Sequence, residues 1–259
     1  MNSNKHLNQF DYRSAIFINV ALFAFVLYLI TIHRFAFNQP VGDDYDAILA
    51  FLNYYIIVQP KEQLLLLVQQ HNEHRILLTH FAMITDLKIF GHINFVHLIW
   101  FGNLGWFMTI LSFWYFSKKY TVSVTDFAPA AIGLLSFSHF EMMTWAMTSI
   151  QQYWQVCFGI LAIGFMVNNR FKSSLLFYIA AVFTSGGGII LAPLINTYYL
   201  LEKKWSQFWI VLIATVGILY LYFSLLPYRA PPASRIWDAL AQPQLIIGYF
   251  LGFIGGLGN

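Results

Sequence analysis

Charged side chains are scarce in this chain. Only 10% of its 259 residues are Asp, Glu, Lys or Arg, whereas an ordinary soluble domain has about 25%. Cysteine occurs once, at Cys157, so an internal disulfide bond is excluded. Hydrophobic residues make up 59% of the chain and aromatic residues 19%, with a mean hydropathy of +0.62. These values exclude an ordinary water-soluble domain and indicate a protein that has the lipid bilayer as its main solvent.

The sequence contains several apolar runs of membrane length. A membrane-spanning helix needs roughly 20 mostly apolar residues, so we expect an all-α, polytopic membrane helix bundle of about seven to eight membrane segments. A single membrane domain should occupy residues 1–259. The runs are Ala15–Ile32, Ile93–Phe116, Phe127–Met147, Trp154–Val167, Leu175–Leu200 and Phe208–Leu226, followed by a shorter run, Leu245–Leu257.

Basic residues are unevenly distributed over the loops, and Lys- and Arg-rich loops stay in the cytoplasm. If the predicted spans cross the membrane in turn, the loops on the cytoplasmic side carry eight of the fourteen Lys and Arg residues. They are Lys5, Arg13, Lys118, Lys119, Arg170, Lys172, Lys203 and Lys204. We therefore expect a multi-pass protein of the plasma (inner) membrane with a cytoplasmic N-terminus and an extracytoplasmic first loop, residues 35–92.

The run of residues 175–200 has basic residues at both ends, and Ser185 with three following glycines interrupts it. Both ends therefore favour the cytoplasm, which predicts a broken helical hairpin that turns back within the membrane. A flexible kink within one helix is the alternative. Non-helical backbone at this depth requires cover by protein or a water-filled cavity.

The first outer loop has apolar residues at spacings of three and four, beginning near Asp44. This period predicts amphipathic helices that lie along the outer membrane surface. Asp43, Asp44 and Asp46 stand where the first of these helices begins. One Asp suffices to cap a helix, whereas three within four positions repel one another and raise the pKa of at least one carboxyl group. The cluster is therefore a candidate for a catalytic base, and capping is the alternative.

A second polar segment follows in the same loop, His71 to Arg75. On a helix, His71 would share a face with His74 and Arg75, where the three could bind a phosphate or contribute to a metal site. Glu141 lies near the outer end of a predicted span, and an ionisable residue at membrane depth is often functional. A solvated end group is the equal alternative for Glu141. Outside this set, His80, His92 and His97 are weaker candidates.

These features resemble the GT-C type integral-membrane glycosyltransferases, specifically the RgtA/B/C/D-like and dolichyl-phosphate-mannose-protein mannosyltransferase-like groups. The resemblance rests on the first apolar run followed by Gly42–Asp46, on the interfacial helices, and on the His71–Arg75 segment. Glu141–Trp145 followed by Gln151 and Gln152 also resembles the outer end of a later helix. It covers most of the chain. Family members are usually longer, so the resemblance implies a truncated member.

The resemblance implies inverting transfer of a sugar from a polyisoprenyl phosphate to an extracytoplasmic cell-envelope glycan such as lipopolysaccharide, a lipid or a protein. It places the base on Asp44 or Asp43. Donors for the leaving phosphate would come from Arg75 and His74. The complete set of substrate-binding candidates is Asp46, Glu73, His74, Arg75, His71, Glu141, Arg229 and Arg235. A divalent metal on the carboxylates is open, but we assign no metal ligand, no cofactor and no nucleic-acid partner.

Two other functions fit the same pattern. A polytopic transporter or lipid flippase would use Glu141, His92 and His97 as a path through the membrane. A non-catalytic scaffold subunit would use the acidic cluster only as a helix cap.

Overall fold

The computed structural model describes residues 12–226, 228–229 and 242–255. It is 81% helical and almost without strands, which confirms the all-α prediction. Four of its helices are long and apolar enough to cross a membrane, rather than the seven to eight segments that we expect from the sequence. They extend over Ser14–Phe35, Phe95–Tyr120, Ala146–Val167 and Trp205–Leu225.

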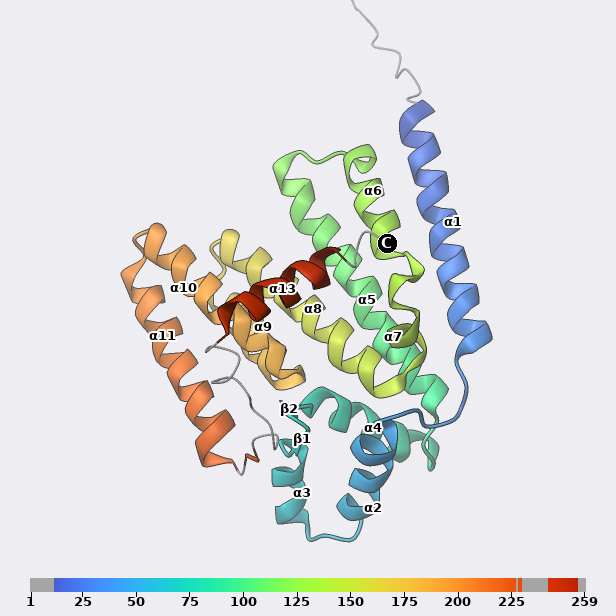
Figure 1. Cartoon of the computed structure of the whole chain (residues 1–259), viewed down its shortest axis with the longest axis vertical. Helices are drawn as coiled ribbons and strands as arrows, with labels where there is room; N and C mark the ends of the chain where they lie inside the picture. Colours follow the sequence, from blue (N-terminus) through green and yellow to red (C-terminus); the bar gives the residue numbers. More distant parts are fainter. Residues whose placement is uncertain (1–11, 227, 230–241, 256–259) are drawn as a thin grey trace, which may run out of the picture.

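The centre of the bundle is a close pair of helices, α5 (Phe95–Ser117) and α8 (Ala146–Val167), with α1 (Tyr12–Phe35) on one side (Figure 1). α5 approaches α8 through small residues, because a Cβ added at Gly105 would stand 2.8 Å from the Trp154 ring. Such small residues let helix backbones approach closely in membranes. On the other side lies α11 (Trp205–Tyr220), which continues as a π-helix, η5 (Leu221–Leu225).

The predicted span Phe127–Met147 is wrong as a single helix. The chain instead forms α6 (Val124–Leu134), a 3-10 turn η3 (Phe137–His139) and α7 (Phe140–Thr144). The break follows Leu134, whose carbonyl accepts a hydrogen bond from the Trp106 indole at 2.7 Å instead of continuing a helix. α8 then begins eight residues before the predicted start and takes in polar residues that a hydropathy reading leaves outside.

Two short helices fill the segment with the three glycines. They are α9 (Phe171–Thr184) and α10 (Leu191–Leu201), joined by the 3-10 helix η4 (Gly186–Ile190). The ends of this segment meet, because the Lys204 ammonium group donates to the Asn169 side chain at 2.6 Å. Lys119, in the short helix η2 (Lys118–Tyr120), donates to the neighbouring Asn168. Three loops with basic residues therefore lie together at one end of the bundle (Figure 1).

The loop of residues 36–92 folds into a platform at the opposite end (Figure 1). It consists of a π-helix η1 (Tyr45–Ala50), α2 (Phe51–Tyr55), α3 (Pro60–Leu67), β1 (Gln70–His71), β2 (His74–Arg75) and α4 (Leu77–Phe90). Ile48 and Leu52 are buried on the face that the apolar spacing predicts. The last helix that the structure describes is α13 (Pro243–Gly255).

The platform corrects one prediction. The segment from His71 to Arg75 is not helical but forms an antiparallel hairpin in which His71 pairs with His74. Asn72 occupies the turn with φ of +48°, a left-handed conformation that Asn tolerates better than most residues. His71, His74 and Arg75 therefore do not share a helical face.

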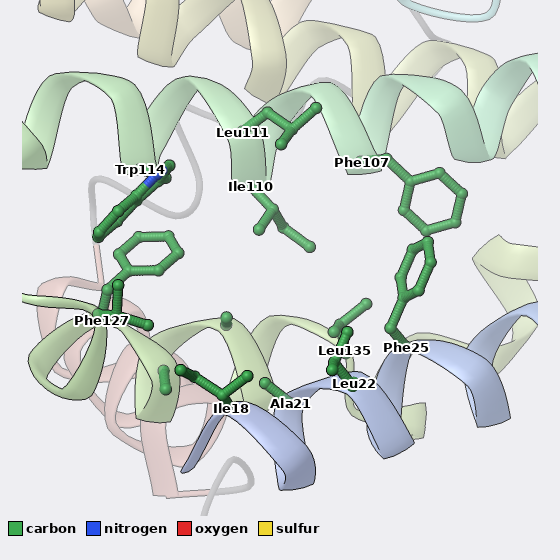
Figure 2. A pocket seen from close by; sticks show the side chains of 13 residues that line it. Ile18, Ala21, Leu22, Phe25, Phe107, Ile110, Leu111, Trp114, Phe127 and Leu135 are labelled. Carbon is green, nitrogen blue, oxygen red and sulfur yellow. The ribbon is translucent and has the colours of Figure 1, made fainter. Parts of the chain in front are cut away.

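An apolar cavity of about 460 Å³ lies between α1, α5 and α6 (Figure 2). Phe25 meets Phe107 edge to face at 5.3 Å between ring centroids, and Trp114 meets Phe127 at 5.1 Å. The cavity separates part of α1 from α5. α1 packs chiefly against α6 and is the most peripheral of the four long helices. Only 11% of its most hydrophobic 18-residue stretch is buried.

Candidate functional site

Asp44 is completely buried where the platform meets the start of α8. One carboxylate oxygen accepts from the Met147 backbone N–H at 2.9 Å, and the other accepts from the Val41 N–H at 3.1 Å. Met147 is the second residue of α8, so Asp44 satisfies an N–H that the helix itself leaves unpaired. The carboxylate therefore caps a helix 103 residues away instead of the helix that it precedes.

Burial raises the pKa of Asp44 from 3.8 to about 6. Hydrogen bonds from Met147 and Val41 oppose this rise, and the charge of Asp43 adds the last contribution to it. The sequence predicts a raised pKa in this cluster through repulsion between carboxylates. The direction agrees, but desolvation is the main cause.

Asp43 is the accessible carboxylate, with 47% of its side chain exposed. Its Oδ2 atom accepts from the Asn72 amide at 3.2 Å and lies 3.7 Å from His71 Nε2. The same Asn72 nitrogen is 3.3 Å from His71 Nε2. Asp43 and Asp44, which the sequence does not distinguish, thus have different environments. Of these two, only Asp43 can contact a molecule from outside.

Asp46 is exposed and borders a cavity of about 250 Å³ between η1–α2, β1 and α4. His71 and the buried His80 border the same cavity. The hairpin register explains this arrangement, because it turns His71 into the gap between the acidic segment and α4. The structure thus brings Asp46 and His71 together around one cavity of the platform, and His71 also lies 3.7 Å from Asp43.

Arg75 is also buried, with 1% of its surface exposed. Its guanidinium donates to the backbone carbonyls of Val68, Tyr222 and Leu226, at distances from 2.6 to 3.2 Å. Tyr222 lies in η5 and Leu226 directly follows it, so the guanidinium lies at the end of this helix, where a cation complements the helix dipole. Arg75 therefore joins the platform to α11, and the contacts of the described residues do not support its expected role as a phosphate ligand.

His74 lies where the hairpin meets the glycine turn of η4. A Cβ added at Gly186 would be 2.9 Å from both His74 Nδ1 and the Tyr222 hydroxyl, so only glycine allows this approach. His74 Nδ1 is buried and has no hydrogen-bond partner among the residues described. Burial lowers the pKa of His74, which favours the neutral ring. Behind this contact, the Gln151 amide donates to the Ser185 hydroxyl at 3.1 Å.

The other sequence candidates are dispersed. Glu73 is exposed on the hairpin turn, and Glu141 is exposed on α7. Arg229 is joined to the hairpin by its backbone, because its N–H donates to Gln70 Oε1 and its carbonyl accepts from Gln70 Nε2, both at 2.7 Å. Its side chain is exposed. Arg235 lies outside the described residues.

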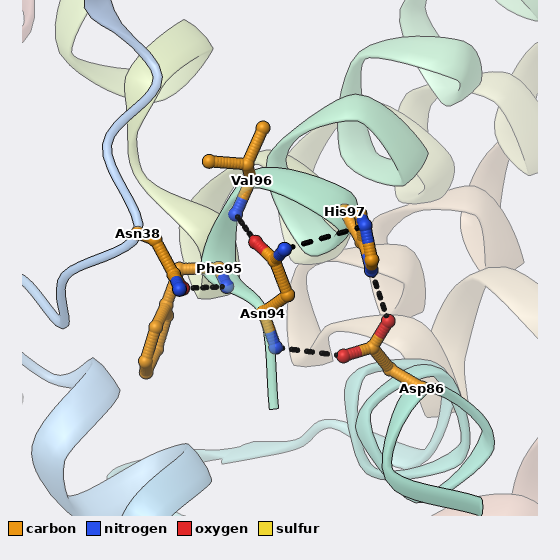
Figure 3. Close-up of polar contacts among 6 residues, drawn as sticks. All are labelled: Asn38, Asp86, Asn94, Phe95, Val96 and His97. Atoms are coloured by element: carbon orange, nitrogen blue, oxygen red, sulfur yellow. Dashed lines mark hydrogen bonds and ion pairs between the residues drawn. The ribbon is translucent and has the colours of Figure 1, made fainter. Parts of the chain in front are cut away.

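A polar network centred on the buried Asp86, which the sequence does not reveal, holds the start of α5 (Figure 3). Asp86 Oδ2 accepts from the Asn94 N–H at 2.8 Å, and Asp86 Oδ1 is 2.8 Å from His97 Nδ1. Asn38 accepts from the Phe95 N–H at 2.9 Å, which fixes the linker after α1 to the same helix end. Asp86 follows apolar residues without a motif, so nothing in its spacing indicates this role.

No group of three or more His, Cys, Asp or Glu side chains in the described part of the chain is arranged to hold a metal ion. Comparisons of the chain with models of protein families, with characterised proteins and with solved structures give no match. The contacts described above are therefore the basis for an account of function.

Proposed function

We propose that this protein is a membrane glycosyltransferase that moves a sugar from a polyisoprenyl-phosphate donor to an acceptor hydroxyl at the extracytoplasmic surface. The observation that carries this proposal is the environment of Asp43. It is a half-exposed carboxylate, held by Asn72 and close to His71, on a platform at the end of the bundle opposite the basic loops. A general base must lie within hydrogen-bonding reach of the proton that it removes, and Asp43 is accessible to such a proton.

In the proposed reaction the acceptor oxygen attacks the anomeric carbon and forms the new C–O bond. The bond from that carbon to the phosphate oxygen breaks, and its electron pair leaves with the phosphate. Asp43 receives the proton of the acceptor hydroxyl, and the configuration at the anomeric carbon inverts. Asn72 fixes the direction of the carboxylate through its amide, so that the base is oriented before the acceptor arrives.

Asp44 is a poor choice for this base because both of its oxygens accept from backbone N–H groups and no surface of it is exposed. We assign it a positioning role: it fixes the start of α8 against the segment that carries Asp43. For the leaving phosphate, the guanidinium of Arg75 is occupied by carbonyls. Arg229, exposed and joined to the hairpin through Gln70, is the cation that we propose instead. His74, on the same hairpin, stays the second candidate donor.

The topology that we propose follows the basic loops. Lys119 and Lys204 lie at one end of the bundle, next to Asn168 and Asn169, and Lys- and Arg-rich loops are retained in the cytoplasm. We therefore propose that the protein lies in the plasma (inner) membrane with the platform outside. This orientation also makes residues 171–201 a hairpin that enters from the cytoplasmic side, so that the membrane segments outnumber the four long helices.

The transporter alternative gains less support. It requires Glu141 and His97 on one path, whereas Glu141 is exposed on α7 and His97 is paired with Asp86 at the start of α5. A scaffold subunit, the third possibility, predicts that the protein tolerates the loss of Asp43.

The test is Asp43→Asn, with Glu62→Gln on α3 as a matched control that removes an exposed carboxylate of the same platform. Cells that lack the protein receive the wild type or either variant, and mass spectrometry compares their envelope glycans. We expect Asp43→Asn to lower sugar transfer by about 10²–10⁴-fold, the usual contribution of general base catalysis, with unchanged melting temperature. Full transfer by Asp43→Asn, or identical glycans with and without the wild-type protein, would refute the proposal.

A further inference from the structure

The cavity of about 250 Å³ in the platform has walls from three segments of the first loop. Asp46, Phe51 and Tyr54 come from one face of η1–α2, Gln69 and His71 from the segment entering the hairpin, and His80 from α4. Its volume is somewhat below the range of about 300–1,000 Å³ that is typical of drug-sized ligands, so a single small ring fits better than an extended molecule. The π-helical turn of η1 lies in this wall, and π-turns occur often at functional sites.

His80 supplies a hydrogen-bond acceptor to this cavity. The residue is 2% exposed, and its Nδ1 lies 2.8 Å from the Leu67 carbonyl, which requires Nδ1 to carry the proton. Burial lowers the pKa of His80 to about 4, so the ring is neutral near pH 7. Nε2 then has a lone pair, and no residue in the described ranges donates to it.

The remaining groups add a second acceptor and an apolar face. Asp46 is an exposed carboxylate, and an ionised carboxylate only accepts hydrogen bonds. Tyr54 is 51% exposed, and Phe51 stacks on His80 at 3.9 Å between ring centroids. A lone pair and a carboxylate repel phosphate but pair well with hydroxyl groups, and the aromatic faces suit the C–H face of a sugar ring. Among the described residues no Lys or Arg borders this cavity, and its one carboxylate disfavours an anion.

We infer that this cavity binds the acceptor as an uncharged, hydroxyl-rich sugar ring, with its hydroxyl groups on Asp46 and His80 Nε2 and one face on Tyr54. His71 connects the cavity to the proposed base, since it borders the cavity and its Nε2 is 3.7 Å from Asp43. The inference rests on the proposed function, in which the bound hydroxyl group attacks the sugar donor. It names the acceptor as a glycan, rather than a protein or a lipid phosphate.

Binding is tested on the full chain in detergent, with methyl glycosides of glucose, galactose and mannose as probes and inorganic phosphate as the charged counterpart. Saturation-transfer NMR measures which probe is bound and how tightly. Tyr54→Ala and Asp46→Asn change exposed side chains, so they should fold. Tyr45→Ala is the matched control, because Tyr45 is 57% exposed on the same helical segment but does not border the cavity.

We expect at least one glycoside to bind, phosphate to give no signal, and binding to weaken about fivefold in Tyr54→Ala and about tenfold in Asp46→Asn. The latter is equivalent to about 1.4 kcal/mol. Tyr45→Ala should bind as the wild type does. If no glycoside binds to a protein that transfers sugar in cells, or if phosphate binds and depends on Asp46, the inference is overturned while the proposed function stands. Glycoside binding that is unchanged in Tyr54→Ala and Asp46→Asn also overturns it. Glycoside binding with these losses, together with full transfer by Asp43→Asn, supports the pocket and refutes the proposed base.

Discussion

Replacing Asp44 by Asn should change how stability depends on pH. The folded protein holds a proton on Asp44 up to about pH 6, whereas the same carboxyl group ionises at 3.8 in the unfolded chain. Between these values the folded state binds more protons than the unfolded state. The stabilisation from protonated Asp44 is therefore complete below pH 3.8 and is lost as the pH rises through 6. Asn does not titrate, so the variant lacks this dependence.

The magnitude follows from the two pKa values of 3.8 and about 6. At 1.36 kcal/mol per pKa unit, the full effect is about 3 kcal/mol, of which about 1.4 kcal/mol is lost between pH 5 and pH 7.5. A chain of this size changes its melting temperature by about 2–4 °C per kcal/mol, which gives about 3–6 °C. Asn also sets an NH₂ group against one of the backbone N–H donors, which costs about 1–3 kcal/mol at every pH.

The assay is thermal unfolding of wild type and Asp44→Asn in the same detergent at pH 5, 6 and 7.5. The difference in melting temperature between the two proteins removes the contribution of all other titrating groups. We expect the wild type to exceed the variant at each pH, and the excess to be about 3–6 °C larger at pH 5 than at pH 7.5. An excess that stays constant, or that grows toward pH 7.5, contradicts the burial argument.

Two further changes test how the platform is attached. Gly186→Ala places a methyl group 2.9 Å from the Tyr222 hydroxyl and should lower the melting temperature by several degrees. The control is Gly217→Ala, whose methyl group meets nothing within 4 Å and which should be neutral or slightly stabilising. Equal effects of the two substitutions would contradict the packing of the η4 turn. Asp86→Asn should destabilise the protein by about 1–3 kcal/mol. An uncharged amide has only one acceptor oxygen, so it cannot accept from both the Asn94 N–H and His97 as the carboxylate does. A melting temperature equal to the wild type in Asp86→Asn would show that this network is not essential.

The sequence predicts the all-helical class correctly because long apolar runs have few other solutions in a membrane, but it does not give the number of long helices. It fails where a polar contact decides the outcome. Gln151 falls between the predicted spans Phe127–Met147 and Trp154–Val167, yet it is buried in α8, where its amide donates to Ser185, 34 residues later. The break after Leu134 likewise depends on the Trp106 indole. Hydropathy averages cannot show such partners.

The candidate site shows the same limit. The acidic cluster is visible in the sequence, but nothing local shows that Asp44 turns inward to Met147 while Asp43 stays accessible. Arg75 matches the expected chemistry of a phosphate ligand, yet its guanidinium donates to Val68 and to the carbonyls of Tyr222 and Leu226, 147 and 151 residues away. His80 is only a weak candidate in the sequence, and nothing local shows that α4 packs it against Phe51 of α2.

Because of the apolar cavity between α1, α5 and α6, the position of α1 depends on the solvent around the protein. Hydrocarbon from the surrounding bilayer can fill a space lined by Phe25, Leu111 and Phe127, whereas these side chains offer water no hydrogen-bond partner. α1 also carries the linker that leads to Asp43, through Asn38 and its bond to Phe95. Detergents that fill this cavity poorly should therefore loosen α1 first. Because α1 leads into the segment that carries Asp43, its loosening should also change the position of that segment.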